Sequence, residues 1–455
     1  MSRAAALVWT LIALILGLVV WFTQPRTHVP SAAPEFLPDF SPAQITQLDL
    51  TWPSGQSIRI AKADGRWTFH AGSTKDATAW PAEPARVQGL LRLLHEAHTA
   101  EAAAAMPSAT FLTLTRESGA PLRLAIHPLS LGGKVAIARL GPDGRVEAVA
   151  SIDEQVGRTI DPLAIEAWRS KDLLFWTPES TSTFESHSAA AKVELAKLGG
   201  AWIMTSPLRT KADAASVEGA LLLLSKSSVE RFLPASDDQH WNEPVRILRF
   251  ASRSNAPGAR RDFEQTIEIG AALDAGTRLV RISAREGESR TTLFGPEVAI
   301  VSNSLLEAIP AQPDSFISRI CLDLPSADVS SIEIGASDQP AAFQRSATGT
   351  FGPADATIRE LLRLLAESPA SRVKLIEKPA EPAPGAIRVR VLGPKAEPLG
   401  EFFLMPSSVA SKVAGAPAVP AIEVASRTIV RSIPWQRPTD FLAALRSLKA
   451  APAAP

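Results

Sequence analysis

A similar passage occurs three times in this chain, and this repeat limits the possible folds more than any other feature. The stretch from Val329 to Phe351 has the length and spacing of Ile45 to Trp67, and the string LLRLL occurs at 90–94 and again at 361–365. Similarity at a long, regular spacing is typical of repeated structural units. The three passages begin at Phe36, Leu173 and Cys321.

Each passage combines strand patterns with one helix pattern. Apolar residues alternate with polar ones up to Trp67, and glycine-containing turns separate the alternating runs. Such alternation predicts antiparallel strands, whereas apolar residues three and four positions apart predict an amphipathic helix. A further strand-rich stretch follows each helix, so we expect an α+β fold of three tandem units, each with antiparallel strands, one helix and a β-meander. The helices are expected over 85–98, 213–228 and 355–368.

The expected units have ordinary domain size, since each spans 130 to 145 residues by the spacing of the repeat. A Pro-rich stretch precedes the first unit, and an Ala- and Pro-rich stretch ends the chain. The predicted boundaries are 1–23 for an anchor, 24–35 for a tether, 36–168, 169–312 and 313–447 for the three units, and 448–455 for a disordered tail.

An uncharged apolar run from Ala4 to Thr23 precedes the body of the chain. About 20 helical residues match the ~30 Å hydrocarbon core of a bilayer, which predicts a transmembrane anchor at residues 4–23. A cleaved signal peptide and a buried core helix are the alternatives. The charges flanking the run are nearly balanced, so the expectation that the body lies outside the cytoplasm rests on the position of the run near the N-terminus.

The charge balance limits the class of partner. The chain has 47 basic and 47 acidic residues, so nothing predicts a phosphate-binding surface and nucleic acid is not expected as a partner. The single cysteine, Cys321, cannot form an internal disulfide and lies in an apolar stretch. It is expected to be a buried small residue rather than a reactive thiol.

The strand-and-helix pattern resembles a bacterial family, the domain of unknown function numbered 4340. The family pattern consists of alternating apolar strand positions, two turn glycines, a tryptophan and a helix of the type VxxLLxxLxxA. In the first passage Ile45, Leu48, Leu50, Gly55, Gly65, Trp67, Val87, Leu90, Leu91 and Leu94 carry it, and in the second Gly200, Trp202, Pro207, Leu208, Ala212, Asp213, Val217, Leu221 and Leu224.

The resemblance covers nearly the whole chain, but its motifs are packing and turn residues rather than site residues. It implies a bacterial inner-membrane protein with one transmembrane helix and an extracytoplasmic body. It also implies a partner in the cell envelope, such as a component of an ABC-type transport system related to gliding motility or export.

Catalytic signatures are absent from the sequence: GxSxG, HExxH, Walker A and GxGxxG do not occur. His95 and His98, and separately Asp237, Asp238 and His240, have metal-capable side chains, but solvated or capping roles are the expected ones. We therefore predict no catalytic residue, no metal and no cofactor, and a protein that is not an enzyme. A hydrolase with two carboxylates brought together by the fold is a less favoured alternative.

Two sets of residues stand out for packing or binding. Trp67, Trp202 and Phe351 occupy equivalent positions and are expected to be core anchors. Arginines cluster after residue 277 and could form a surface for anionic ligands, although basic residues on strand edges also prevent unwanted pairing. The arginines of this candidate surface are Arg278, Arg281, Arg285 and Arg290.

These features favour a membrane-anchored, non-catalytic scaffold or accessory protein of an envelope transport, motility or export system. The alternative is an extracytoplasmic protein that binds a glycan or a peptide on a sheet face. The oligomeric state stays open.

Overall fold

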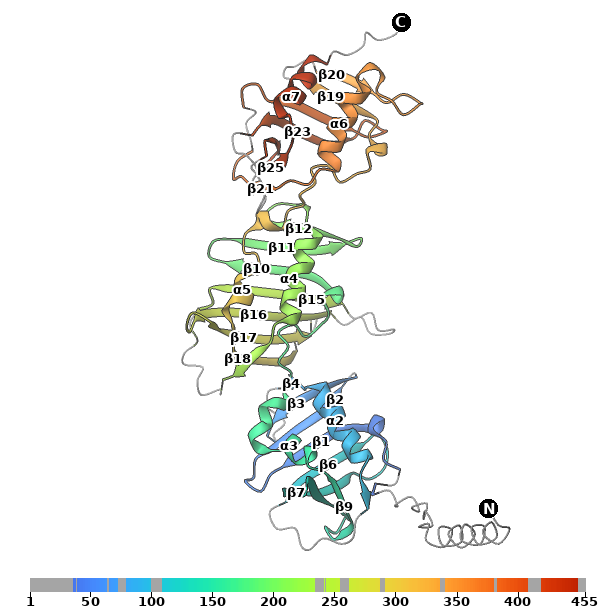
Figure 1. The fold of residues 1–455 in the computed structure, drawn as a ribbon, viewed down its shortest axis with the longest axis vertical. Helices are drawn as coiled ribbons and strands as arrows, with labels where there is room; N and C mark the ends of the chain where they lie inside the picture. Colours follow the sequence, from blue (N-terminus) through green and yellow to red (C-terminus); the bar gives the residue numbers. More distant parts are fainter. Residues whose placement is uncertain are drawn as a thin grey trace, which may run out of the picture. The chain divides into compact units, whose positions relative to one another are not determined.

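The computed structural model describes residues 36–448 apart from 38, 64, 73–78, 100–108, 234–240, 242, 254–261, 287–290, 336–339, 380–382 and 408–418. The described residues form three antiparallel sheets of nine, nine and seven strands, each from a consecutive stretch of the chain (Figure 1). By contact density the chain divides into two compact units, residues 1–170 and 171–455, and the second unit contains two of the sheets.

The first sheet belongs to residues 1–170. Its apolar face is built by alternation: Leu48 lies opposite Ile60 on one neighbouring strand and opposite Leu114 on the other, and all three are fully buried. Its strands are β1 (Ile45–Thr51), β2 (Ser57–Ala63), β3 (Arg66–Ala71), β4 (Ala79–Pro81), β5 (His98–Thr99), β6 (Thr110–Arg116), β7 (Leu122–Leu131), β8 (Lys134–Leu140) and β9 (Val146–Asp153), and its helices are η1 (Pro42–Gln44), α2 (Pro84–His95), α3 (Gln155–Thr159) and η2 (Pro162–Trp168).

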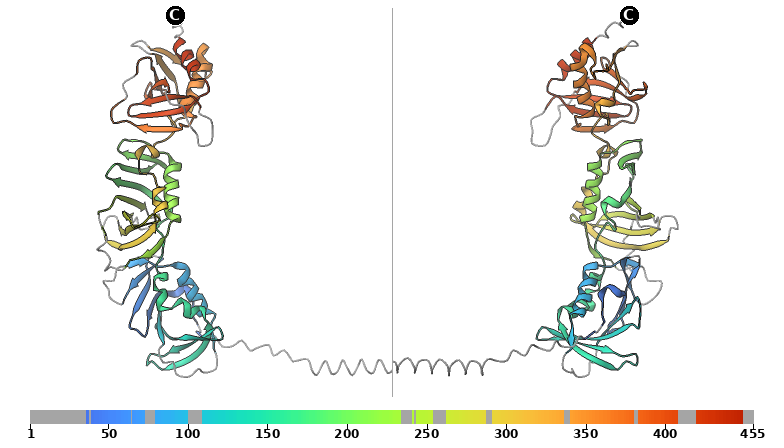
Figure 2. Two further views of the ribbon diagram at one scale, coloured as in Figure 1. Left: turned by 60° about the vertical axis from the view of Figure 1, so that its left-hand side comes forward. Right: turned by 90° about the vertical axis from the view of Figure 1, so that its right-hand side faces the viewer.

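The second sheet repeats the first in the unit of residues 171–455. Its helix α4 lies against one face of the sheet in the views of both Figure 1 and Figure 2. The strands are β10 (Thr181–Ser188), β11 (Lys192–Leu198), β12 (Ala201–Ser206), β13 (Thr210–Lys211), β14 (Val229–Phe232), β15 (Arg246–Arg253), β16 (Asp262–Ala272), β17 (Thr277–Glu286) and β18 (Thr292–Ser302), and the helices are η3 (Pro178–Ser180), α4 (Ala214–Lys226), α5 (Asn303–Glu307) and η5 (Pro313–Phe316).

The third sheet has fewer strands. A cluster of buried apolar residues from the strands and both of its α-helices forms its core. The strands are β19 (Ser331–Gly335), β20 (Ala341–Gln344), β21 (Arg372–Leu375), β22 (Ile387–Leu392), β23 (Pro398–Pro406), β24 (Ala421–Ser426) and β25 (Ile429–Pro434), and the helices are η6 (Ser326–Asp328), η7 (Gly352–Ala354), α6 (Asp355–Ala366) and α7 (Pro438–Ser447).

One strand order underlies all three sheets. The first has the order β4-β3-β2-β1-β6-β7-β8-β9-β5, and the second has the same order once each label is raised by nine. The third, β20-β19-β22-β23-β24-β25-β21, lacks counterparts of β3 and β4. In every sheet the long helix follows the strand at one edge and precedes the strand at the other edge. The helix therefore crosses the face of its sheet.

The predicted α+β fold class is wrong, because the chain is mostly β-sheet. The longest described helices have 12 or 13 residues, whereas 25 strands make up the sheets. A helix of 12 residues is about 18 Å long and can cover several strands. One such helix covers part of a nine-stranded sheet, and the chain between the long helices is mostly strand.

The predicted inner-membrane location of a single-pass protein is contradicted as well. Among the helices of the described residues, none has the length and apolar character needed to cross a bilayer. The predicted anchor at 4–23 and the tether at 24–35 lie outside the described residues, as do all but the first residue of the tail at 448–455. The extracytoplasmic placement of the body depended on that anchor and is not retained.

Candidate functional site

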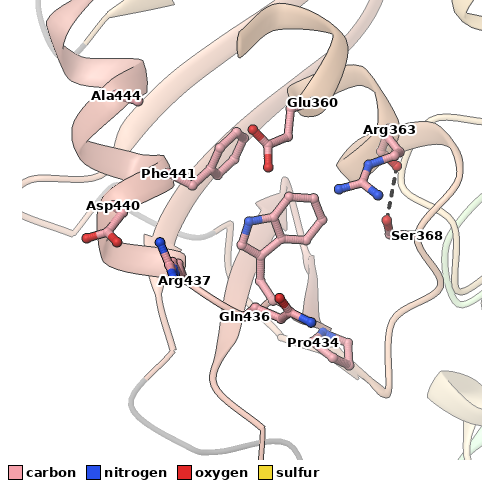
Figure 3. Close-up of a pocket in the computed structure, with 10 residues that line it drawn as sticks. Glu360, Arg363, Ser368, Pro434, Gln436, Arg437, Asp440, Phe441 and Ala444 are labelled. Carbon is pink, nitrogen blue, oxygen red and sulfur yellow. Dashed lines mark hydrogen bonds between the residues drawn. The ribbon is translucent and has the colours of Figure 1, made fainter. Parts of the chain in front are cut away.

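A groove of about 630 Å³ lies between α6 and α7 on the third sheet, in the unit of residues 171–455 (Figure 3). Its volume is in the range of ligand-binding clefts. It is lined by Glu360, Arg363, Ser368, Pro434, Trp435, Gln436, Arg437, Asp440, Phe441 and Ala444.

The helix α6 places charged side chains on one wall of the groove. Asp355 fixes the start of the helix, because its carboxylate accepts the N–H of Phe351 at 2.9 Å and pairs with Arg359 at 2.7 Å. The apolar stripe of the helix is buried against the sheet. Glu360 and Arg363 lie off that stripe and therefore line the groove.

The helix α7 forms the other wall. It begins with Pro438 at its first position, where the absent N–H of proline costs no helical hydrogen bond. Phe441, Leu442 and Leu445 are buried against the core, and this fixes how the helix lies on the sheet. Arg437 and Asp440 consequently line the groove at the beginning of α7.

The half-buried indole of Trp435 lies between these walls, directly after β25. Its ring centre is 5.3 Å from that of Phe441, and the Arg363 guanidinium lies 5.1 Å from the ring centre. A guanidinium over an indole face is held by the negative potential of the ring. The groove therefore contains a large apolar surface that is ordered by its neighbours on two sides.

The polar groups of the groove carry both signs of charge. Figure 3 shows the carboxylate of Glu360 pointing into the space between the helices, whereas Asp440 points away from Glu360. Two carboxylates that act together in glycoside hydrolysis have to flank one bond, and this pair does not face a common point. The arrangement is suited to holding a ligand that presents an apolar group beside charged groups.

The three predicted anchors differ in burial. Trp202 and Phe351 are almost fully buried, with 2% and 3% exposure, whereas Trp67 is half-buried. The fully buried tryptophan of the first sheet is Trp80 on β4, whose indole donates to the carbonyl of Ser170 at 2.8 Å. A basic side chain lies over each predicted anchor: Lys62 over Trp67, Lys197 over Trp202 and Arg345 over Phe351.

The three described arginines of the predicted surface, Arg278, Arg281 and Arg285, do not all lie on one face of β17. Arg281 pairs with Glu268 at 3.6 Å and lies 4.4 Å from the ring centre of Trp241. Arg278 donates to the side chain of Asn303 at 2.8 Å, and its position along β17 places it on the opposite face of the strand from Arg281. Arg285 is exposed, and Arg290 lies outside the described residues.

The histidine pair of the first helix does not share a helix in the structure. The helix α2 ends at His95, whose ring lies 6.2 Å from that of Phe40, and His98 belongs to β5. The one-turn helical spacing on which the predicted metal pair depended is therefore absent between these two residues. Asp237, Asp238 and His240 lie outside the described residues.

A different set of potential metal ligands occurs on the second sheet, where oxygens or nitrogens of Glu185, His187 and Glu194 lie within 4.8 Å of one another. Lys192 already pairs with Glu194 at 2.5 Å, and Arg249 lies 3.8 Å from Glu185. These cations balance the two carboxylates, so we interpret the set as a network of ion pairs. Its members come together through strand pairing, which their sequence spacing does not reveal.

The sequence did not point to the residues of the groove. A signal for α7 was present, because Pro438 precedes Phe441, Leu442 and Leu445 at helical spacing. The resemblance to the family numbered 4340 depends on packing positions and concerns none of the groove residues. Comparison with protein-family models and with curated protein sequences gives no match to this chain.

Proposed function

We propose that this protein is a non-catalytic scaffold that binds a protein partner through the groove between α6 and α7. The observation that carries the proposal is the half-buried Trp435, which is ordered by Phe441 and Arg363 and surrounded by charges of both signs. Tryptophan and arginine are the residues most enriched among those that dominate the affinity of protein interfaces.

The chemistry of the groove favours a peptide segment over a small apolar molecule. Glu360 and Arg437 can pair with charges on a peptide, while Trp435 and Phe441 offer apolar area. A segment with an apolar side chain next to charged ones would use both kinds of group. Interfaces between proteins commonly combine an aromatic centre with a polar rim in this way.

The repeated sheets support a scaffold role. One strand order occurs three times, and proteins built from repeated units commonly offer extended binding surfaces. The resemblance to the family numbered 4340 favours a component of an ABC-type transport system as the partner. This choice of partner rests on the resemblance alone.

A glycan is the second candidate ligand, and Trp435 is the residue that favours it. An indole face can stack on the apolar face of a sugar ring, and Gln436 and Asp440 line the same groove with hydrogen-bonding groups. One side of the indole already faces the Arg363 guanidinium, which reduces the face open to a sugar. We therefore place the glycan second.

The test is a selection of displayed random peptides on the full chain. We expect wild-type protein to enrich a consensus with one apolar residue beside charged residues, and Trp435→Ala to lose that consensus. Phe111→Ala is the matched control, because Phe111 is another partly exposed aromatic, 48% exposed on β6 of the first sheet. The control variant should enrich the wild-type consensus.

Two outcomes would overturn the proposal. One is the absence of any consensus that depends on Trp435. The other is thermal stabilisation by soluble cell-wall saccharides that is lost in Trp435→Ala, which would assign the groove to a glycan.

A further inference from the structure

In the first two sheets a further strand pairs with β2 and β11, but in the described part of the third sheet no further strand pairs with β20, the counterpart of β2 and β11. In the first sheet β2 pairs on its outer side with β3, and in the second β11 pairs with β12. The counterpart in the third sheet is β20, which pairs with β19 and is the last strand in the sheet order of the described residues. Among the described residues, this side of the strand order is therefore extended by two further strands in the first and second sheets and by none in the third.

The missing strands have a cause in the sequence. From the aromatic anchor to the first buried position of the helix there are 20 residues in the first passage and 15 in the second, but only 7 in the third, between Phe351 and Ile358. Seven residues are too few for a strand along β20 and a return to the helix. After Phe351 the chain enters η7 and α6 directly.

Hydrogen-bond direction shows which groups the edge presents. Arg345 donates its amide N–H to the carbonyl of Ser330, toward β19, at 2.8 Å. Amides of successive strand residues point to opposite sides, so the N–H groups of Ala342 and Gln344 point away from β19. Both residues are exposed, and no charge occurs within Ala341–Gln344 to discourage pairing at the edge.

We propose that β20 accepts one extended segment of a partner protein as an additional antiparallel strand. A row of outward amide and carbonyl groups is complemented by another extended backbone, and main-chain hydrogen bonds supply affinity in such strand addition. Pro340 precedes β20, which limits the pairing to about four residues. The inference adds a second surface to the proposed function and rests on it in taking the partner to be a protein.

The first two sheets indicate which side chains the added strand should carry. Phe69 lies opposite Ile60 in the first sheet, Met204 lies opposite Leu195 in the second, and all four are buried. Phe343 on β20 corresponds to Ile60 on β2 and to Leu195 on β11, and it is also buried. The segment should therefore place an apolar side chain opposite Phe343, while the side chains on either side of it point to the other face of the sheet.

The probe is a fluorescein-labelled peptide with the sequence of residues 200–206, GAWIMTS, which forms the covering strand of the second sheet. Its binding to the full chain is followed by fluorescence anisotropy. Ala342→Pro removes one outward N–H and leaves the pairing with β19, so we expect affinity to fall by about tenfold or more. Ala342→Val keeps the N–H and should bind like the wild type.

The controls separate this edge from the groove. A scrambled peptide should not bind, and Trp435→Ala should bind the probe as the wild type does, since it alters only the groove. Equal affinity in Ala342→Pro and Ala342→Val, or no binding of the probe to the wild type, would overturn the inference. A wild-type dimer that Ala342→Pro converts to a monomer would overturn it as well, because a second copy would then occupy the edge.

Discussion

At the residue scale, Arg246 is a buried cation that donates hydrogen bonds to neutral groups. Its guanidinium donates to the hydroxyl of Ser186 at 2.9 Å and to the carbonyls of Ile309 and Pro310, and burial lowers the pKa of Arg246 to about 10. The group remains charged at neutral pH. Its hydrogen bonds hold the segment after α5 to the second sheet.

Replacing Arg246 should destabilise the second sheet. In Arg246→Met the carbonyls of Ile309 and Pro310 lose their donor, so we expect the free energy of unfolding in urea to fall by about 1–3 kcal/mol. Arg249→Met is the control, because Arg249 lies on the same strand and is exposed. Its loss should change the free energy by less than about 0.5 kcal/mol, and equal effects of the two variants would contradict this account.

The Cys321 thiol should react slowly with disulfide reagents in the folded protein. Burial raises its pKa from 9.0 to about 11, although the nearby positive charge of Arg431 acts in the opposite direction. At pH 8 the thiolate fraction, and with it the rate of reaction with a disulfide reagent, should be about a hundredfold lower in the folded chain than in guanidinium chloride. Similar rates in the two conditions would show that the thiol is accessible.

The raised pKa of Cys321 also makes the stability of the folded protein depend on pH. Because the folded state keeps the thiol proton up to a higher pH than the unfolded state, the contribution of Cys321 is complete below pH 9 and is lost as the pH rises to about 11. In Cys321→Ser the hydroxyl stays protonated throughout that pH range. The stability difference between wild type and variant should therefore narrow between pH 9 and 11 in urea unfolding.

At the element scale, the long helices begin at carboxylates. Asp213 accepts the N–H of Ala215 at 3.1 Å at the start of α4, and Glu83 accepts that of Ala85 at 3.3 Å at the start of α2. Asp213 also lies 3.6 Å from Arg319, a half-exposed pair of little expected energy.

Removing the Asp213 cap should lower stability by about 1 kcal/mol in Asp213→Ala, whereas Asp213→Asn keeps an acceptor at the cap and should lose little. Urea unfolding of the full chain compares the two variants. If Asn destabilises as much as Ala, the ion pair rather than the cap matters and the prediction fails.

Local patterns in the sequence predicted the helices well where they had apolar stripes. The helix expected over 355–368 is found at Asp355–Ala366, and that expected over 213–228 at Ala214–Lys226. The helix expected over 85–98 ends three residues earlier than expected, at His95, so His98 is not part of it. Caps and stripes act over a few residues, which makes such elements visible without the fold.

The residues of the candidate groove could not be predicted in the same way. Trp435 and Glu360 are 75 positions apart and come together through the packing of two helices on one sheet. Trp67 lies opposite Lys62 as Trp202 lies opposite Lys197, yet Trp67 is half-buried and Trp202 almost fully buried. The fully buried Trp80 lies on β4, where its indole donates to the Ser170 carbonyl. Local sequence does not specify which of two tryptophans a distant segment will cover.

At the scale of the whole molecule, the chain consists of two compact units, 1–170 and 171–455. Leu90 is fully buried in the first unit. In Leu90→Ala we expect a loss of about 2–5 kcal/mol confined to the calorimetric transition of that unit, with the remaining heat absorption unchanged. A uniform shift of all the heat absorption would show that the two units unfold as one.

The central claim is that the third sheet carries the surface for a protein partner. The most direct test is hydrogen exchange of the full chain with and without a peptide selected by the wild-type protein, as described above. Amides of α6 and α7 should exchange more slowly when the peptide is bound, while the first two sheets stay unchanged. Slower exchange confined to the first or second sheet, or no change in any segment, would contradict the account.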